Sequence, residues 1–177
     1  MSKALVVIDV QKGMWEHPDY PPHDGDGVVA RIAELIGKAR AAGVPVLYVQ
    51  HHALGEPGHP LMPGKPGFAF HDAVAPAPGD DVTVKHNSSA FHGTDFDAKL
   101  KAAGIDHLVI AGMQSEYCVD SAIRGAHERG YTVTLVADAH ATGDTRVAKA
   151  KDIVAIQNDT MAGDFADVIP TAMVTFA

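Results

Sequence analysis

The chain has 177 residues, a length that favours one domain with a substantial buried core. Apolar residues make up 46% and charged residues 20%, as in ordinary globular proteins, and no stretch resembles a signal peptide or a membrane span. The net charge of −8, without any basic run, excludes typical nucleic-acid-binding proteins. A single cysteine cannot form an internal disulfide, which fits a reducing compartment. We therefore expect a cytoplasmic protein without membrane or nucleic-acid partners.

Apolar runs alternate with helical periodicity in the first half of the chain. Residues 4–8 are continuously apolar, which is typical of a strand buried on both faces of a parallel sheet. Residues 11–26 are rich in proline and glycine and predict a loop. Residues 28–39 repeat apolar side chains at helical spacing. Residues 45–49 predict the second strand, with proline at its first position, where proline is tolerated.

Residues 50–81 form an irregular segment in which prolines alternate with glycines. A segment of this length inside a compact domain is usually a functional loop, although a solvated surface excursion is the alternative. The segment also contains His51, His52, His59 and His71. We predict a long active-site loop at about 50–81.

The same alternation continues to the end of the chain. Strands are predicted at 82–84, 108–111, 131–136 and 167–170. Gly112 breaks the apolar run at 108–111. One helix ends at Gly104, a second runs from Cys118 to Gly130, and a third is capped by Asp144 with Val147, Ala150, Ile153 and Val154 on its inner face. The pattern predicts a single-domain three-layer α/β/α fold with a mostly parallel, roughly six-stranded sheet.

Three chemically complementary residues follow predicted strands. Asp9 ends the first strand, Lys85 ends the third, and Cys118 lies at the junction of the fourth strand with a helix. Each alone has a structural explanation: a capping aspartate, an exposed lysine, an inert core cysteine. Ligands, however, bind outside the carboxyl ends of parallel strands. There the helix N-terminus and Lys85 would lower the thiol pKa, and Asp9 would accept its proton.

Three segments that contain these residues resemble the signature segments of the isochorismatase-like cysteine hydrolases. They are LVVIDVQ (5–11), VKHNSSAF (84–91) and GMQSEYCV (112–119). This superfamily includes nicotinamidases, N-carbamoylsarcosine and ureidoacrylate amidohydrolases, and isochorismatases. The resemblance implies one domain over residues 1–177 and a catalytic triad of Asp9, Lys85 and Cys118. It also implies a cis peptide between Met113 and Gln114, and an oxyanion hole formed by the backbone N–H groups of Gln114 and Cys118.

The segment after the second strand departs from one branch of this superfamily. Metal-binding nicotinamidases carry an Asp-x-His motif there, whereas this chain has Val49-Gln50-His51-His52. Adjacent histidines on an extended segment point in opposite directions and chelate poorly. We therefore expect no nicotinamidase-type metal site and no cofactor, although other histidines of the loop could still gather a metal ion. His51 or His52 then either contacts substrate or has no role.

The sequence thus predicts a cysteine-dependent hydrolase that cleaves a C–N bond of a small molecule through a thioester. The alternatives are a vinyl ether hydrolase of the isochorismatase type and a thiol-based redox sensor. Candidate substrate contacts are Phe91, Trp15, Phe68 and Gln11, although Phe91 fits the core equally well. The resemblance implies a homo-oligomer, a dimer or tetramer, and the apolar tail 173–176 could pack on a neighbouring subunit.

Overall fold

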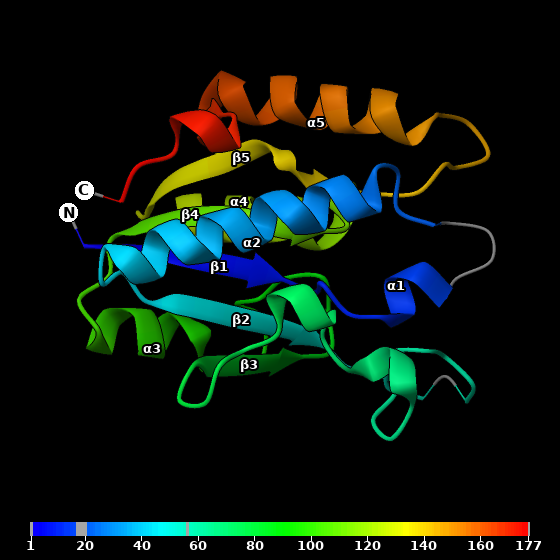
Figure 1. Ribbon diagram of the computed structural model, residues 1–177. Helices are drawn as coiled ribbons and strands as arrows, with labels where there is room; N and C mark the ends of the chain where they lie inside the picture. Colours follow the sequence, from blue (N-terminus) through cyan, green and yellow to red (C-terminus); the bar gives the residue numbers. More distant parts are fainter. Residues whose placement is uncertain (1, 17–20, 56, 177) are drawn as a thin grey trace.

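A six-stranded parallel sheet forms the centre of the computed structural model, which describes residues 2–16, 21–55 and 57–176 (Figure 1). The strand order is β3-β2-β1-β4-β5-β6. The strands are β1 (Lys3–Ile8), β2 (Val46–His51), β3 (Asp81–Lys85), β4 (His107–Met113), β5 (Thr132–Ala141) and β6 (Asp167–Ile169). Strand order changes direction between the central strands β1 and β4, the position at which parallel sheets bind ligands.

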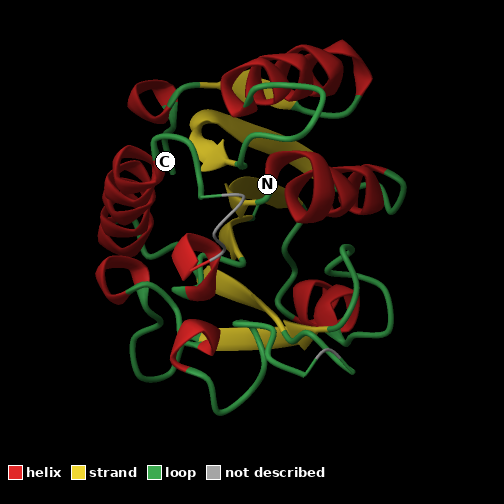
Figure 2. Cartoon of the chain, turned by 90° about the vertical axis from the view of Figure 1, so that its right-hand side faces the viewer, coloured by secondary structure: helices red, strands yellow, loops and turns green. Residues whose placement is uncertain are grey.

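Helices cover both faces of the sheet because its central strands are apolar on both sides. In β1, Leu5 and Val7 pack into one core and Val6 and Ile8 into the other. Helix α2 (Gly25–Ala41) covers the first face, and α3 (Phe96–Ala102), α4 (Asp120–His127) and α5 (Ala150–Asp164) cover the second. Figure 2 shows helices on both sides of the strands. The predicted single-domain α/β/α fold is confirmed.

Two helical regions, around α1 and before α5, differ from the predictions. A short helix, α1 (Gly13–Glu16), forms where only loop was predicted; residues 17–20 of that stretch lie outside the described residues. Asp144 does cap α5, since its Oδ1 accepts the Ala150 N–H at 2.9 Å. The placement of Val147 on the inner face of that helix is wrong, because Val147 precedes the helix and is 93% exposed.

Strand β4 continues past the glycine predicted to break it. Gly112 has a φ of 133° and lies opposite Ile8 of β1, where a Cβ would be 2.1 Å from the Ile8 carbonyl oxygen. The pairing with β5 shifts register between Ile110 and Gly112. Glycine is needed here because the backbones of β1 and β4 approach each other closely, just before the two strands end.

The irregular segment after β2 is packed against the body of the protein. It contains two short 3₁₀ turns, η1 (Pro66–Phe68) and η2 (Asp72–Val74), and it buries Leu61 and Phe70. The segment is therefore not a solvated surface excursion over its whole length, because Leu61 and Phe70 are buried in the protein.

The C-terminal tail also packs on its own chain. Val174 and Phe176 are buried in the core beneath α2. Only Met173 of this tail is a large exposed apolar side chain. The apolar character of the tail is therefore explained without a neighbouring subunit. None of the helices in the described ranges has the length and apolar character needed to cross a bilayer.

Candidate active site

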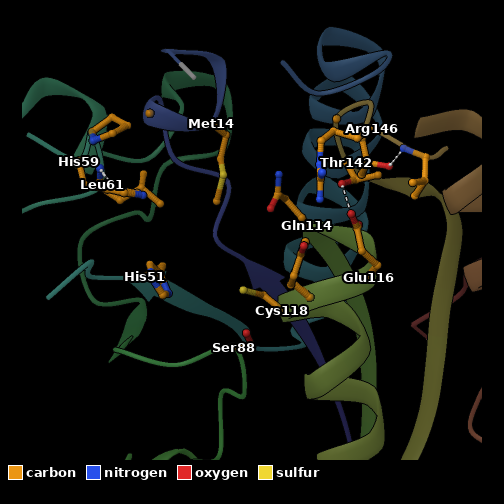
Figure 3. Close-up of a pocket in the computed structure, with 16 residues that line it drawn as sticks. Met14, His51, His59, Leu61, Ser88, Gln114, Glu116, Cys118, Thr142 and Arg146 are labelled. Atoms are coloured by element: carbon orange, nitrogen blue, oxygen red, sulfur yellow. Dashed lines mark hydrogen bonds between the residues drawn. The ribbon is translucent and has the colours of Figure 1, made fainter. Parts of the chain in front are cut away.

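A cavity of about 690 Å³ lies beyond the carboxyl ends of the central strands (Figure 3). Figure 3 shows the Cys118 sulfur pointing across it toward His51, with Glu116, Thr142 and Arg146 on the Cys118 side and His59 and Leu61 opposite. The lining comes from six segments of the chain: Gly13 and Met14; His51; His59, Pro60 and Leu61; Ser88; Gln114, Glu116, Tyr117 and Cys118; and Thr142, Gly143, Thr145, Arg146 and Val147.

Asp9, Lys85 and Cys118 meet at one end of this cavity. The Lys85 Nζ atom lies 2.6 Å from Asp9 Oδ2 and 3.1 Å from Cys118 Sγ. It also donates to the Asn87 carbonyl at 3.0 Å. The Asp9 and Lys85 side chains are completely buried, and Cys118 is 9% exposed. One ammonium therefore contacts both the carboxylate and the sulfur.

A tight turn after β1 places the Asp9 carboxylate. The Asp9 N–H donates to the Val49 carbonyl at 2.9 Å, and the Asp9 carbonyl accepts the Gln11 N–H at 2.8 Å. Asp9 adopts a φ of 51°, in the left-handed region that aspartate tolerates better than most residues. Such a conformation costs about 1 kcal/mol or more and is common at functional sites.

Burial and mutual attraction together shift the pKa values of Asp9 and Lys85. Loss of solvent raises the pKa of Asp9 above its ordinary value, although Lys85 opposes the shift. Burial by itself lowers the pKa of Lys85, but attraction to Asp9 and Cys118 outweighs it, so that the Lys85 pKa is raised.

The same burial, together with the charge of Asp9, raises the pKa of Cys118 to about 12. The prediction that Lys85 would lower the thiol pKa is therefore wrong, because desolvation and the charge of Asp9 outweigh the attraction of Lys85. The raised pKa favours the protonated thiol of Cys118, which has Asp9 and Lys85 as its ionisable neighbours.

The turn that presents Cys118 has an unusual backbone. The Met113–Gln114 peptide is cis, and a π-helical turn, η3 (Ser115–Val119), continues into α4. The Gln114 carbonyl accepts the N–H groups of Tyr117 and Val119 at 3.2 and 3.1 Å. Both Gln114 and Cys118 line the cavity.

A buried histidine that the sequence analysis did not single out supports this turn. His140, near the end of β5, is 2% exposed, and its Nδ1 lies 2.8 Å from the Ser115 hydroxyl. Its Nε2 lies 2.9 Å from Asn158 Oδ1. The predicted strand ended at residue 136, whereas β5 extends to Ala141, so the sequence analysis did not place His140 at a strand end.

His51 is the fourth ionisable side chain of the site. Its Nδ1 lies 3.2 Å from Lys85 Nζ, and burial together with the charge of Lys85 lowers its pKa to about 4. Among the described residues, Asp9, His51 and Cys118 form one group whose potential metal-ligating atoms lie within 4.8 Å of one another. All three contact the Lys85 ammonium, which is therefore a cation that they share.

Gln11 does not line the cavity but is buried beside the end of β2. It is completely buried, its Nε2 donates to the carbonyls of His51 and Phe68 at 3.0 and 2.9 Å, and its Oε1 accepts the His51 N–H at 2.9 Å. Both the oxygen and the nitrogen of its side-chain amide are thus hydrogen-bonded within the chain. Gln11 holds the end of β2 instead of contacting a ligand in the cavity.

The three predicted aromatic contacts also lie outside the cavity lining. Phe91 is 7% exposed and packs against Phe96 and Tyr131, so its alternative role in the core is the one observed. The Trp15 ring packs against His71, and the Phe68 ring packs against His52. Their loops do reach the cavity, but other residues of those loops line it.

Several lining residues carried no signal in the sequence. Met14 belongs to the unpredicted helix α1, Leu61 to the irregular segment, and Thr142 and Arg146 to the loop after β5. Thr142 donates to Glu116 Oε1 at 2.9 Å and so links that loop to the turn before Cys118. Such positions follow from how loops meet, and no periodicity marks them.

Comparisons with known proteins identify the family of this chain. The family model described as the isochorismatase domain matches residues 3–172. A streptothricin hydrolase from Streptomyces noursei is 36% identical over 99% of this chain and 71% of its own length. The ureidoacrylate amidohydrolase RutB of Methylobacterium radiotolerans is 32% identical over 82% of this chain and 70% of its own.

The fold is shared with solved structures as well. The crystal structure of a putative hydrolase of the isochorismatase family from Chromobacterium violaceum superposes with a TM-score of 0.89 and 31% identity, covering 97% of this chain and 91% of the other. Family model, relatives and structure agree over nearly the whole chain. The protein described here belongs to the isochorismatase family of hydrolases.

Proposed function

We propose that this protein is a cysteine amidohydrolase that cleaves a C–N bond of a small molecule through a thioester intermediate. The observation that carries the proposal is the contact of Lys85 Nζ with both Asp9 and Cys118 at the end of the cavity. The relatives named streptothricin hydrolase and ureidoacrylate amidohydrolase support it at the level of reaction class.

In the proposed first step, Asp9 takes the Cys118 proton as the substrate carbonyl enters, and the sulfur attacks the carbonyl carbon. The raised pKa of Asp9 makes it a better proton acceptor than an exposed carboxylate. The ammonium of Lys85, 3.1 Å from the sulfur, stabilises the thiolate while it forms. The N–H groups of Gln114 and Cys118 then stabilise the tetrahedral oxyanion.

In the second step, Asp9 gives its proton to the departing nitrogen, which leaves as ammonia or an amine. Water, deprotonated by Asp9, attacks the thioester, and the thiol is regenerated when Asp9 returns the proton to sulfur. Lys85 keeps its protons throughout. Asp9 is the base, Lys85 the electrostatic partner and Cys118 the nucleophile.

The redox-sensor alternative is less compatible with this site. Sensor cysteines combine a low pKa with exposure to solvent. Cys118 has a pKa raised to about 12 and is 9% exposed. Its sulfur is arranged for activation by an entering substrate rather than for constant reactivity.

The test is ammonia release from nicotinamide, N-carbamoyl compounds, ureides and simple aromatic amides, with and without a chelator. Cys118→Ala is expected to abolish turnover, and mass spectrometry of the quenched wild-type reaction is expected to detect the acyl-thioester. Ser89→Ala, which alters a side chain outside the cavity lining, is the matched control. Full activity of Cys118→Ala, with circular dichroism showing an intact fold, would refute the proposal.

We further propose that the protein works in the cytoplasm, since a free thiol persists in a reducing compartment. We also propose that it acts as a dimer or tetramer. Sedimentation velocity at micromolar concentration tests the assembly, and a single monomeric species would contradict it.

A further inference from the structure

His51 is held rigidly at the edge of the cavity. It is the last residue of β2, and its backbone N–H and carbonyl are both bound by the Gln11 amide, at 2.9 and 3.0 Å. Its ring lines the cavity across from Cys118 (Figure 3). The position of the ring is therefore set by buried structure rather than by a ligand.

Contact with Lys85 fixes the tautomer of this ring. A lysine ammonium can only donate, so the Nδ1 atom 3.2 Å from it must present a lone pair. A proton on Nδ1 would face a cation at that distance. The proton of the neutral ring must therefore be on Nε2.

This assignment leaves the two ring nitrogens with different roles. The Nδ1 lone pair faces Lys85, so it is not free to act as a base or to bind a metal ion. The Nε2–H group has no hydrogen-bond partner within the described part of the chain. The ring thus offers the cavity one fixed donor.

We propose that His51 selects amides that carry an acceptor oxygen within a few bonds of the scissile carbonyl. The inference rests on the proposed hydrolase function, because it requires the carbonyl to bind at Cys118. Carboxylate, ureido and second amide oxygens all belong to this substrate class. A saturated carbon at the same place would leave the Nε2–H group desolvated and unpaired, which lowers affinity.

The tautomer can be measured without any turnover. In ¹⁵N-labelled protein, the His51 signals are identified by their loss in His51→Gln. We expect the shift pattern of an Nε2-protonated neutral ring at pH 7, retained at pH 5. The charged groups and histidines around this ring are Lys85, Asp9, His52, His59 and His86. A signal from an Nδ1-protonated ring, or from an imidazolium at pH 7, overturns the inference.

Selectivity is measured by binding to the Cys118→Ser protein, which lacks the proposed thiol nucleophile. Oxamide and propanamide are matched probes, because both are neutral primary amides and only oxamide has an oxygen next to the scissile group. We expect oxamide to bind about tenfold more tightly, the effect of one hydrogen bond. When His51→Leu is combined with Cys118→Ser, the ratio of the oxamide affinity to the propanamide affinity should fall to about one. His51→Gln, which keeps an N–H donor, should retain most of the preference for oxamide.

His52→Gln is the control, since the neighbouring His52 ring packs against Phe68 and His86 outside the cavity lining. A ratio that persists in His51→Leu, or no binding of either amide, overturns the proposal. If the predicted tautomer and selectivity are found but no amide is hydrolysed by the wild-type protein, the thioester chemistry fails and the role of His51 in binding stands.

Discussion

At the scale of single residues, the site depends on one buried ammonium. Lys85 contacts Asp9, Cys118, His51 and the Asn87 carbonyl, and its side chain is completely buried. Removing a charge from water is costly unless partners compensate for it. The stability of the fold and the ionisation of Cys118 are therefore coupled through this side chain.

Lys85→Met is expected to lower the free energy of unfolding by about 3–5 kcal/mol, because Asp9 is left buried without its counter-ion. Urea denaturation at pH 7 measures the loss. The double variant Asp9→Asn/Lys85→Met should be more stable than Lys85→Met alone, because no uncompensated charge remains. If Asp9→Asn further destabilises the Lys85→Met protein, the two residues do not form the ion pair described.

The pH dependence of activity should reflect the raised pKa of Asp9. A protonated Asp9 cannot accept the thiol proton, so kcat/KM falls as the pH drops through the Asp9 pKa. Burial raises that pKa above the ordinary value of 3.8, and the acid limb of kcat/KM should lie correspondingly higher. Circular dichroism over the same range distinguishes this limb from unfolding. An acid limb at or below 3.8 would contradict the assigned base.

At the scale of elements, the close approach of β1 and β4 aligns the two strand ends that carry the site. Asp9 follows β1, and the turn to Cys118 follows β4. At Gly112 the two backbones lie so close that a side chain has no room. A change there alters both the sheet and the geometry of the site.

Gly112→Ala is expected to cost at least about 3 kcal/mol, because the added Cβ would lie 2.1 Å from a backbone oxygen at a φ of 133°. Gly37→Ala is the matched control. Gly37 lies in α2 with nothing within 4 Å, so alanine should stabilise by about 0.5–1 kcal/mol. Chemical denaturation compares them, and equal effects of the two substitutions would show that β1 and β4 tolerate a wider separation.

At the scale of the whole molecule, burial of histidines makes stability depend on pH. Burial lowers the pKa of His51, His107 and His140 from the ordinary value of 6.5, for His51 to about 4. At these three histidines, the unfolded state therefore binds more protons than the folded state at pH values between the lowered pKa values and 6.5. The stabilisation is present above pH 6.5 and is lost as the pH falls through the lowered values.

The contribution of these histidines to the free energy of unfolding should thus decrease from pH 7 toward pH 5, against the opposite contribution of Asp9, whose pKa is raised on folding. Urea denaturation at a series of pH values measures the decrease, and His51→Gln should make it shallower because one such group has been removed. Identical slopes for the two proteins would show that His51 titrates alike in the folded and unfolded states.

The sequence by itself determined the layered fold and the triad candidates. Continuous apolar runs such as residues 4–8 mark strands buried on both faces, and polar residues directly after such strands must meet at one edge of a parallel sheet. Asp9 and Lys85 were identified for this local reason. The helix after Cys118 was predicted from the spacing of its apolar residues; it ends at His127, shortly before the predicted stop at Gly130, which has a φ of 83°.

Only the tertiary structure decided the cavity lining and the ionisation of the site. The lining is formed where loops from distant parts of the chain meet, so Phe91, Trp15 and Phe68 could not be distinguished in advance from Met14, Leu61 and Arg146. The thiol pKa follows from desolvation, which depends on everything packed around the sulfur. The tautomer of His51 likewise depends on its distance from Lys85, 34 residues away along the chain. Local sequence patterns record which residues share a strand or helix face, whereas burial and contact are properties of the assembled molecule.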